Sequence, residues 1–279
     1  MDGKKIKNIV ILILLIADVF LAALVVSDRI TDAAAARAMK NGIYEAAELN
    51  GVKLSADAGL ESPPFPKYTM YRDLNAEKKM ADGLLGKCSV SDLGGNIMFY
   101  SSDAGRATFR GTGEFDIAFD PGKYPAEGGA ELTAVSFLGK MGLKTRETRA
   151  ANNSDGQTET VTALIDFNET PVFNAYVTFT FSDDSLILVS GKRPPDKPGP
   201  AEEYSFDAAT VLMRFIELIG SEGYVCSEIN LLTGGFVLSD TAPGGVVLIP
   251  VWRIDADAGV YYINGLTGKP ETVHPAPDA

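Results

Sequence analysis

The sequence predicts an α+β fold: a single N-terminal transmembrane helix followed by repeated modules, each of which is a short helix and then an antiparallel sheet. Two patterns predict it. An apolar run of 18 residues near the N-terminus holds one ionisable side chain, and further along the chain helical periodicity precedes a group of strand-like segments three times. With 46% hydrophobic and 22% charged residues in 279, the chain has the composition of a folded protein.

The apolar run covers residues 9–26. As a helix it would be about 27 Å long at 1.5 Å per residue, which matches the hydrocarbon core of a bilayer once flanking residues contribute. We expect a transmembrane helix over 8–28, with residues 1–7 in the cytoplasm because three lysines precede the run. The remainder of the chain is then extracellular. Small residues at 33–36 make a cleaved signal peptide the alternative.

Asp18 is the one ionisable residue in this run. An ionised carboxylate at the centre of a bilayer costs at least about 2.5 kcal/mol on insertion scales, so we expect the side chain to be protonated or paired. We interpret Asp18 as a candidate contact with a helix of a partner protein. The alternative is that a very apolar helix tolerates one carboxyl group.

Residues 29–67 are expected to form a helical stalk and a linker. The segment is rich in alanine, a strong helix former, as far as Asn50-Gly51, and the prolines from residue 63 onward end any helix. Two α+β modules are expected over 68–193. Their helices are predicted at 74–85 and 126–141, and their strands at 96–101, 107–110, 114–119, 158–167 and 173–181.

A third module is expected over 205–273, after a Pro-rich linker at 194–204 and before a tail at 274–279. Its helix begins at Ser205 or Asp207, either of which can cap a helix, and carries an apolar stripe. Three strands follow. They are predicted at 224–238 with a turn at Gly234-Gly235, at 246–254 with a local edge or bulge at Pro250, and at 260–263.

The composition argues against an enzyme and against nucleic acid as a partner. A net charge of −12 provides no basic surface for phosphates, and no glycine-rich phosphate-binding motif occurs. The single histidine, His274, lies in the tail, so no histidine-based triad or metal site is expected within the fold. We expect no catalytic residue, metal or cofactor. The alternative is a wall-modifying enzyme with an unrecognised site.

The acidic pairs and the two cysteines are expected to have structural roles. The aspartates at 183–184 and within 255–257 fall in predicted hairpin turns, where aspartate is favoured by turn geometry alone. Calcium binding is the alternative for these carboxylates. Cys88 and Cys226 lie far apart and outside any metal-binding spacing, so we expect two buried thiols.

Three stretches resemble the YycI branch of the YycH/YycI family. They are the N-terminus, with its short basic lead and an acidic residue deep in the helix, the segment VVLIPVWRIDADAGVYYINGLTGK at 246–269, and the order of anchor, stalk and modules. The segment also overlaps with PepSY-type modules. Gly3 and the Ala-rich stalk depart from the family pattern. The residues that define the last module are Pro250, Trp252, Arg253, Tyr261, Tyr262, Asn264, Gly265 and Gly268.

These residue types have clear roles in folding. Trp252 has a large apolar body and one N–H that needs an acceptor. Asn264 and Gly265 tolerate left-handed backbone and are therefore expected in a turn. They identify a module without showing what it binds.

The resemblance implies a non-enzymatic, membrane-anchored regulator of a cell-envelope sensor histidine kinase, with that kinase and a sibling YycH-type regulator as partners. Contacts would form in the membrane and outside it, and preferential binding of one kinase conformation would shift the equilibrium toward that conformation. The alternative is an extracellular PepSY-like binding or inhibitor module that holds a peptide, a protease or a wall polymer at a sheet edge.

Overall fold

The computed structural model describes the chain in five stretches, which are residues 40–60, 62–152, 158–222, 226–242 and 245–276. Two compact units are present, Met1–Leu54 and Ser55–Ala279. In the described part of the first unit, a helix over 40–49 precedes strand β1, Lys53–Leu54. The helix ends at Asn50-Gly51, as the sequence indicated: Gly51 adopts left-handed backbone with φ of +76°, and the side-chain amide of Asn50 donates to the carbonyl oxygen of Ala46 (2.8 Å).

The second unit consists mostly of β-strands. Its helices are α2 (Leu74–Leu85), α3 (Ala130–Lys140) and α4 (Ala208–Glu222). Its strands are β2 (Pro66–Tyr71), β3 (Ser89–Gly94), β4 (Ile97–Ser102), β5 (Gly105–Arg110), β6 (Glu114–Phe119), β7 (Lys144–Asn152), β8 (Thr158–Phe167), β9 (Thr170–Ser182), β10 (Ser185–Lys192), β11 (Lys197–Tyr204), β12 (Glu228–Ala242), β13 (Gly245–Ala256) and β14 (Gly259–Asn264). The bounds of α2 and β8 are those that the sequence predicted.

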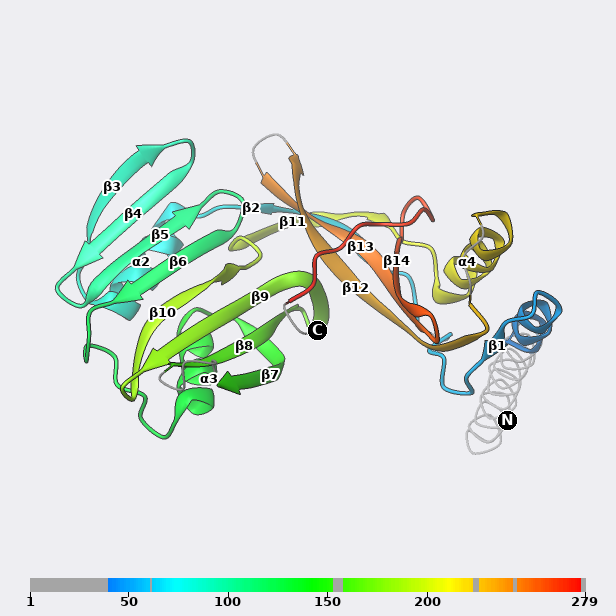
Figure 1. Cartoon of the computed structure of the whole chain (residues 1–279). Coiled ribbons are helices and arrows are strands. Elements are labelled where there is room, and N and C mark those ends of the chain that lie inside the picture. Colours follow the sequence, from blue (N-terminus) through cyan, green and yellow to red (C-terminus); the bar gives the residue numbers. More distant parts are fainter. Residues whose placement is uncertain (1–39, 61, 153–157, 223–225, 243–244, 277–279) are drawn as a thin grey trace, which may run out of the picture. The chain divides into compact units, whose positions relative to one another are not determined.

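These strands form one large mixed sheet, as Figure 1 shows. The hydrogen-bonded order is β11-β2-β13-β12-β9-β10-β6-β5-β4-β3, with β14 beside β13, β8 beside β9 and β7 beside β8. The predicted fold class is therefore wrong, because strands of all three expected modules share a single sheet. Local periodicity identifies a strand but not its partner, and here β2 pairs with β13 near the other end of the chain.

The predicted N-terminal span also has no counterpart in the described residues. None of the described helices combines the length and the apolar character that crossing a membrane requires. The transmembrane helix expected over 8–28, and Asp18 within it, lie outside the described residues.

Two antiparallel halves of the sheet meet where β9 crosses β12. They are joined by one parallel pair, Phe236 with Val172. Gly235 allows this close approach, since a Cβ atom there would lie 2.5 Å from ring atoms of Phe173 and 2.8 Å from the carbonyl oxygen of Pro171. The turn predicted at Gly234-Gly235 is wrong. Both glycines lie inside β12 and leave room for aromatic rings above the backbone.

Helices α2 and α3 cover one half of the sheet and α4 covers the other, and the main core extends from the first half onto residues of β2, β12 and β13. The larger core lies between α2, α3 and the strands from β4 to β10, where the rings of Phe137 and Phe179 meet edge to face at 5.6 Å. In the other half, Phe215 of α4 and Trp252 of β13 are almost completely buried. The indole N–H of Trp252 donates to the carbonyl oxygen of Phe206 (3.1 Å), so its one polar group is satisfied.

Part of the segment expected as a Pro-rich linker is a strand. Residues 197–204 form β11 and pair with β2, with Lys197 opposite Tyr71 and Tyr204 opposite Pro66. The prolines in this segment predicted a linker because they cannot donate to a ladder. An edge strand tolerates them, because one of its sides needs no donors.

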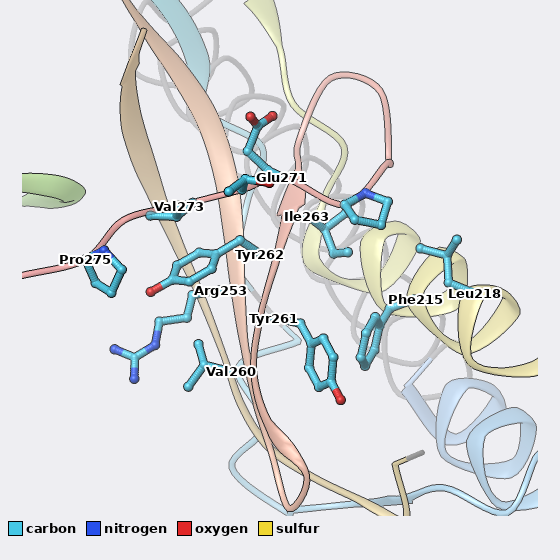
Figure 2. A pocket seen from close by; sticks show the side chains of 12 residues that line it. Phe215, Leu218, Arg253, Val260, Tyr261, Tyr262, Ile263, Glu271, Val273 and Pro275 are labelled. Carbon is cyan, nitrogen blue, oxygen red and sulfur yellow. The ribbon is translucent and has the colours of Figure 1, made fainter. Parts of the chain in front are cut away.

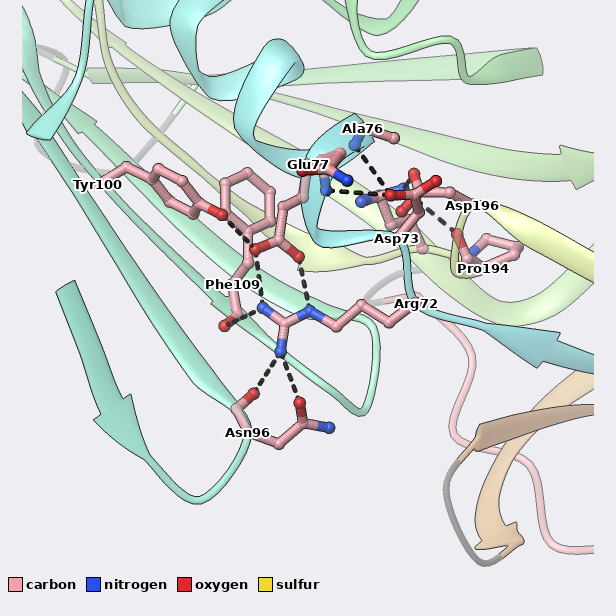
Figure 3. Close-up of polar contacts among 11 residues, drawn as sticks. Arg72, Asp73, Ala76, Glu77, Asn96, Tyr100, Phe109, Pro194 and Asp196 are labelled. Carbon is pink, nitrogen blue, oxygen red and sulfur yellow. Dashed lines mark hydrogen bonds and ion pairs between the residues drawn. The ribbon is translucent and has the colours of Figure 1, made fainter. Parts of the chain in front are cut away.

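A buried ion pair connects the end of β2 to α2 and the β4–β5 hairpin (Figure 3). The Arg72 guanidinium donates to both carboxylate oxygens of Glu77 (2.7 and 2.8 Å) and to the backbone carbonyls of Asn96 and Phe109. Tyr100 donates its hydroxyl to the same carboxylate (2.8 Å). Only 2% of the Glu77 side chain is exposed, so both of its oxygens depend on these partners.

Removal of this carboxylate should be strongly destabilising. Glu77→Ala leaves the largely buried guanidinium of Arg72 without its carboxylate partner, and we expect the free energy of unfolding to fall by about 3–5 kcal/mol. Lys78→Ala is the matched control on the same helix, because the Lys78–Asp82 pair is largely exposed and should contribute about 0.5 kcal/mol or less. Urea unfolding followed by circular dichroism measures both. Equal effects of the two variants would contradict the role of the buried pair.

Candidate functional site

Strand β14 has one edge that is only half covered. Its ladder partner among the described strands is β13, with Trp252 opposite Ile263. On the outer side, the carbonyl oxygen of Tyr262 accepts from the N–H of Glu271, and the N–H of Asn264 donates to the carbonyl oxygen of Lys269 (both 2.8 Å). Because backbone groups alternate along an antiparallel strand, the N–H and C=O of Val260 also point outward.

A cavity of about 450 Å³ lies along this edge (Figure 2). Its volume is within the usual range for ligand pockets. Side chains from both faces of β14 reach it: Tyr261 and Ile263 project toward α4, whereas Val260 and Tyr262 project to the opposite side. The complete lining is Phe215, Leu218, Arg253, Val260, Tyr261, Tyr262, Ile263, Pro270, Glu271, Thr272, Val273 and Pro275.

Helix α4 forms the apolar wall of the cavity. Asp207 fixes the start of this helix, because its carboxylate accepts from the backbone N–H of Thr210 (2.7 Å). The apolar stripe of the helix then faces the sheet, and the rings of Phe215 and Tyr261 lie 5.0 Å apart in a tilted arrangement. Leu218, one turn further along, extends the same wall.

The opposite wall carries Arg253 and Tyr262. The Tyr262 ring packs edge to face on Phe173 at 5.3 Å. Burial raises the pKa of Tyr262, and Arg253 opposes that rise. Arg253 Nε lies 2.9 Å from a carboxylate oxygen of Asp255, yet the N–H is not aimed at that oxygen, so within the described residues neither buried atom has a hydrogen-bond partner.

A tight turn after β14 brings the C-terminal segment back onto the edge. The Asn264 side chain accepts from the backbone N–H groups of Leu266 and Thr267 (3.0 and 3.1 Å) and donates to the carboxylate of Glu271 (2.9 Å). Left-handed backbone, expected at Asn264 and Gly265, is found at Gly268 instead, where φ is +70°.

Gly265 is needed in this turn for a different reason. A Cβ atom there would lie 2.8 Å from the Cβ of Ser205 and 3.0 Å from the carbonyl oxygen of Pro250. Glycine is therefore required at this position because neighbouring atoms leave no room for a side chain, and not because of its φ angle.

Pro250 lies at a point of β13 where, among the described strands, one side has no ladder partner, which is the local edge that the sequence predicted. Strand β2 pairs with residues 246–248 of β13, and β14 pairs with residues 251–256. Pro250 occupies the gap between them. Its carbonyl oxygen accepts from the N–H of Gly265 (2.8 Å), so its nitrogen points to the same gap, where a ladder donor is not required.

The structure brings three of the residues that the sequence pattern singles out, Arg253, Tyr261 and Tyr262, into this cavity and places Trp252 in the core beneath it. The pattern does not single out Phe215 or Glu271. Phe215 belongs to the apolar stripe of its helix, and the Lys-Pro-Glu sequence after the last glycine has the character of a chain end. The sequence feature that could have indicated a segment folding back onto the sheet is the carboxylate of Glu271, two residues after the Gly-Lys turn.

Asp183 and Asp184 lie in a tight turn, and both cysteines are buried. In the stretches that the structure describes, no group of three or more His, Cys, Asp or Glu side chains is arranged to hold a metal ion. Asp183 and Asp184 both adopt left-handed backbone, with φ of +49° and +54°, as a tight hairpin requires. Cys88 and Cys226 are free and buried, and burial raises the pKa of Cys226 to about 11.

Comparisons with known proteins leave the family open. No protein-family model matches the chain, and no curated protein matches it. Among solved structures, an uncharacterized protein from Eubacterium rectale ATCC 33656 covers 80% of this chain and 90% of its own, with a TM-score of 0.49 and 10% identity. The YpeB C-terminal domain from Bacillus megaterium covers 75% and 99%, with a TM-score of 0.37 and 14% identity.

Both likenesses are too distant to establish a fold family, a partner or an activity. Neither of them points to the YycI branch. Membership of that branch stays a prediction from the sequence.

The raised pKa of Tyr262 predicts a loss of stability at alkaline pH. An unfolded tyrosine ionises near pH 10, whereas the folded phenol keeps its proton to higher pH. Stability should therefore fall as the pH rises above about 10. Tyr262→Phe should lose less stability than the parent chain between about pH 9 and 11. Urea unfolding followed by the fluorescence of Trp252, the single tryptophan, measures this difference, and identical pH profiles would contradict it.

Proposed function

We propose that the second unit is a non-enzymatic binding module that takes up an extended polypeptide segment along the open edge of β14. The observation that supports this is the half-covered edge itself. Val260 directs both of its backbone groups outward beside a cavity of about 450 Å³ that has an apolar wall. Strand addition to a sheet edge takes its affinity from such backbone groups and its specificity from side-chain pockets on either face.

The other sheet edges are less suited to this role. Strand β11 contains Pro198 and Pro200, which remove backbone donors. Strand β7 is rich in charged residues, a common protection against edge pairing. Strand β3 is exposed along all six residues, so an added strand would gain backbone bonds there without an enclosed wall. Only β14, of the edges that the structure describes, combines outward backbone groups with aromatic walls.

The open part of the edge supports a weak, reversible complex. The N–H and C=O of Val260 and the N–H of Tyr262 offer three hydrogen bonds, each worth about 1 kcal/mol net. An apolar side chain buried against Phe215 and Tyr261 adds about 1.5–3 kcal/mol. The cost of association offsets part of this gain. Reversible binding of this kind suits a module that senses or regulates a partner.

The proposal extends to the location of the module and to the proteins that it binds. The family resemblance implies action outside the cell, with a sensor histidine kinase and a sibling regulator as partners. An extended segment of either protein is a ligand of the class proposed above. Preferential binding of one kinase conformation would then shift its equilibrium, and the shift is limited by the difference in affinity.

Val260→Pro tests strand addition directly. The substitution removes an outward N–H but no bond to β13, so the fold should be retained, while binding of an extended peptide should weaken about tenfold, equivalent to about 1.4 kcal/mol. Binding is measured by selection from a peptide library, followed by titration of the selected peptides. Leu93→Ala, at an exposed position of the edge strand β3, is the control and should bind like the parent. Equal affinities for both variants would contradict the proposal.

The partner assignment has a separate test. Co-purification of the sensor kinase with the full chain should be reduced by Asp18→Leu if that carboxyl group contacts a helix of the kinase. Unchanged association and signalling would remove Asp18 from the proposal while leaving the β14 site unaffected.

A further inference from the structure

The edge of β14 already carries a short strand from its own chain. Residues 269–275, which we call the strap, return after the turn and make an isolated antiparallel bridge between Ile263 and Pro270. Two backbone hydrogen bonds hold the strap, one from Glu271 to Tyr262 and one from Asn264 to Lys269. Figure 2 shows Glu271 and Val273 following one another along this segment at the cavity.

The strap also ends the sheet on this side. Since Tyr262 and Asn264 direct their backbone groups outward, Ile263 directs its own toward β13. Its bridge partner Pro270 therefore turns its nitrogen away from β14. That nitrogen carries no hydrogen, so the outer side of the strap lacks a donor there. A strand added to the outer side of the strap would lack this hydrogen bond, which favours replacement of the strap over addition to it.

We propose, on the basis of the function proposed above, that the strap is an internal mimic of the ligand. The site takes an extended peptide with a carboxylate at the position of Glu271 and an apolar side chain two residues later, at the position of Val273. The ligand displaces the strap and pairs with the whole edge from Val260 to Asn264.

The carboxylate requirement comes from the contacts of Glu271. Its oxygen accepts from the side-chain amide of Asn264 (2.9 Å), whose own oxygen is engaged by the turn, so Asn264 presents a donor to whatever lies on the edge. Arg214 stands beside the turn and donates to the carbonyl oxygen of Thr267 (3.2 Å). Among the described residues Arg214 has no carboxylate partner. Its positive charge stays beside the edge when the strap leaves, on a chain whose net charge is −12, and favours an acidic segment.

The apolar requirement comes from the position of Val273. Residues 271 and 273 of an extended strap share one face, and this is the face on which Asn264 and Tyr262 lie. Val273 lines the cavity with Tyr262 and Arg253. An apolar side chain there covers the Tyr262 ring, whose other contact is Phe173.

Displacement of the strap is feasible because few bonds hold it. Among the described residues its hydrogen bonds to β14 are the two backbone bonds and the Glu271–Asn264 bond. Segments held by so few contacts open locally at low cost. A peptide that pairs along the whole edge recovers these bonds and adds those of Val260.

The test uses the full chain and a labelled peptide with the strap sequence KPETVHP, followed by fluorescence anisotropy. The parent chain should bind this peptide weakly, because its own strap competes. Glu271→Ala in the chain should tighten binding about tenfold, equivalent to about 1.4 kcal/mol. Glu131→Ala, on an exposed position of α3, is the matched control and should bind like the parent. In the peptide, glutamine in place of glutamate should weaken binding to every chain.

The outcomes separate this inference from the function on which it rests. Equal affinity of the peptide for the parent and Glu271→Ala chains overturns the strap as a competitor, and equal affinity for the glutamate and glutamine peptides overturns the ligand class. Binding of library peptides without binding of KPETVHP overturns the mimicry and leaves strand addition intact. Absence of binding by any library peptide overturns the proposed function itself.

Discussion

The arrangement of the second unit depends on a close approach of two strands at a residue without a side chain. At Gly235 the ring of Phe173 lies where a Cβ would be, and this contact allows β9 and β12 to meet in one parallel pair. Any larger residue would push apart the two antiparallel halves of the sheet. The ring of Phe173 then packs against Tyr262 at 5.3 Å. The constraint that joins the halves thus also supports one wall of the cavity.

The buried pair of Arg72 and Glu77 is a second connection of this kind. It fixes the chain where β2 leaves one half of the sheet and α2 begins to cover the other. Strand β2 also pairs with β13, the strand that supports β14. The proposed binding edge is therefore built on a strand with neighbours on both sides, and its side chains are held by packing and not by loops, a favourable basis for a specific site.

Local sequence patterns predicted many of the helices and strands, but they did not predict which strands pair with one another. Helix α2 and strand β8 have the predicted bounds, because helical periodicity and alternation are local signals. The modular fold class was wrong because hairpin patterns do not reveal that β6 pairs with β10. Gly234-Gly235 was misjudged as a turn, because both glycines lie inside β12 and contacts with aromatic rings require them there. The local edge at Pro250 was predicted correctly, because a missing backbone donor is a local signal. The tyrosines of β14 stand out in the sequence, whereas the strap that covers them does not.

The pairing of β2 with β13 has a consequence for how the chain is made. Strands β3 to β10 are joined largely by hairpins and complete their half of the sheet from residues 89–192 alone. Met70 of β2 cannot pair until its partner Val246 of β13 has been synthesised, and Val246 is synthesised late. Long-range pairing of this type is slow, because the chain loses the entropy of closing a long loop before it gains the stabilising contacts. Until then the side of β2 that faces β13 presents unpaired backbone to its surroundings. The nascent chain therefore passes through a period in which half of it is folded and the half that carries the site is not.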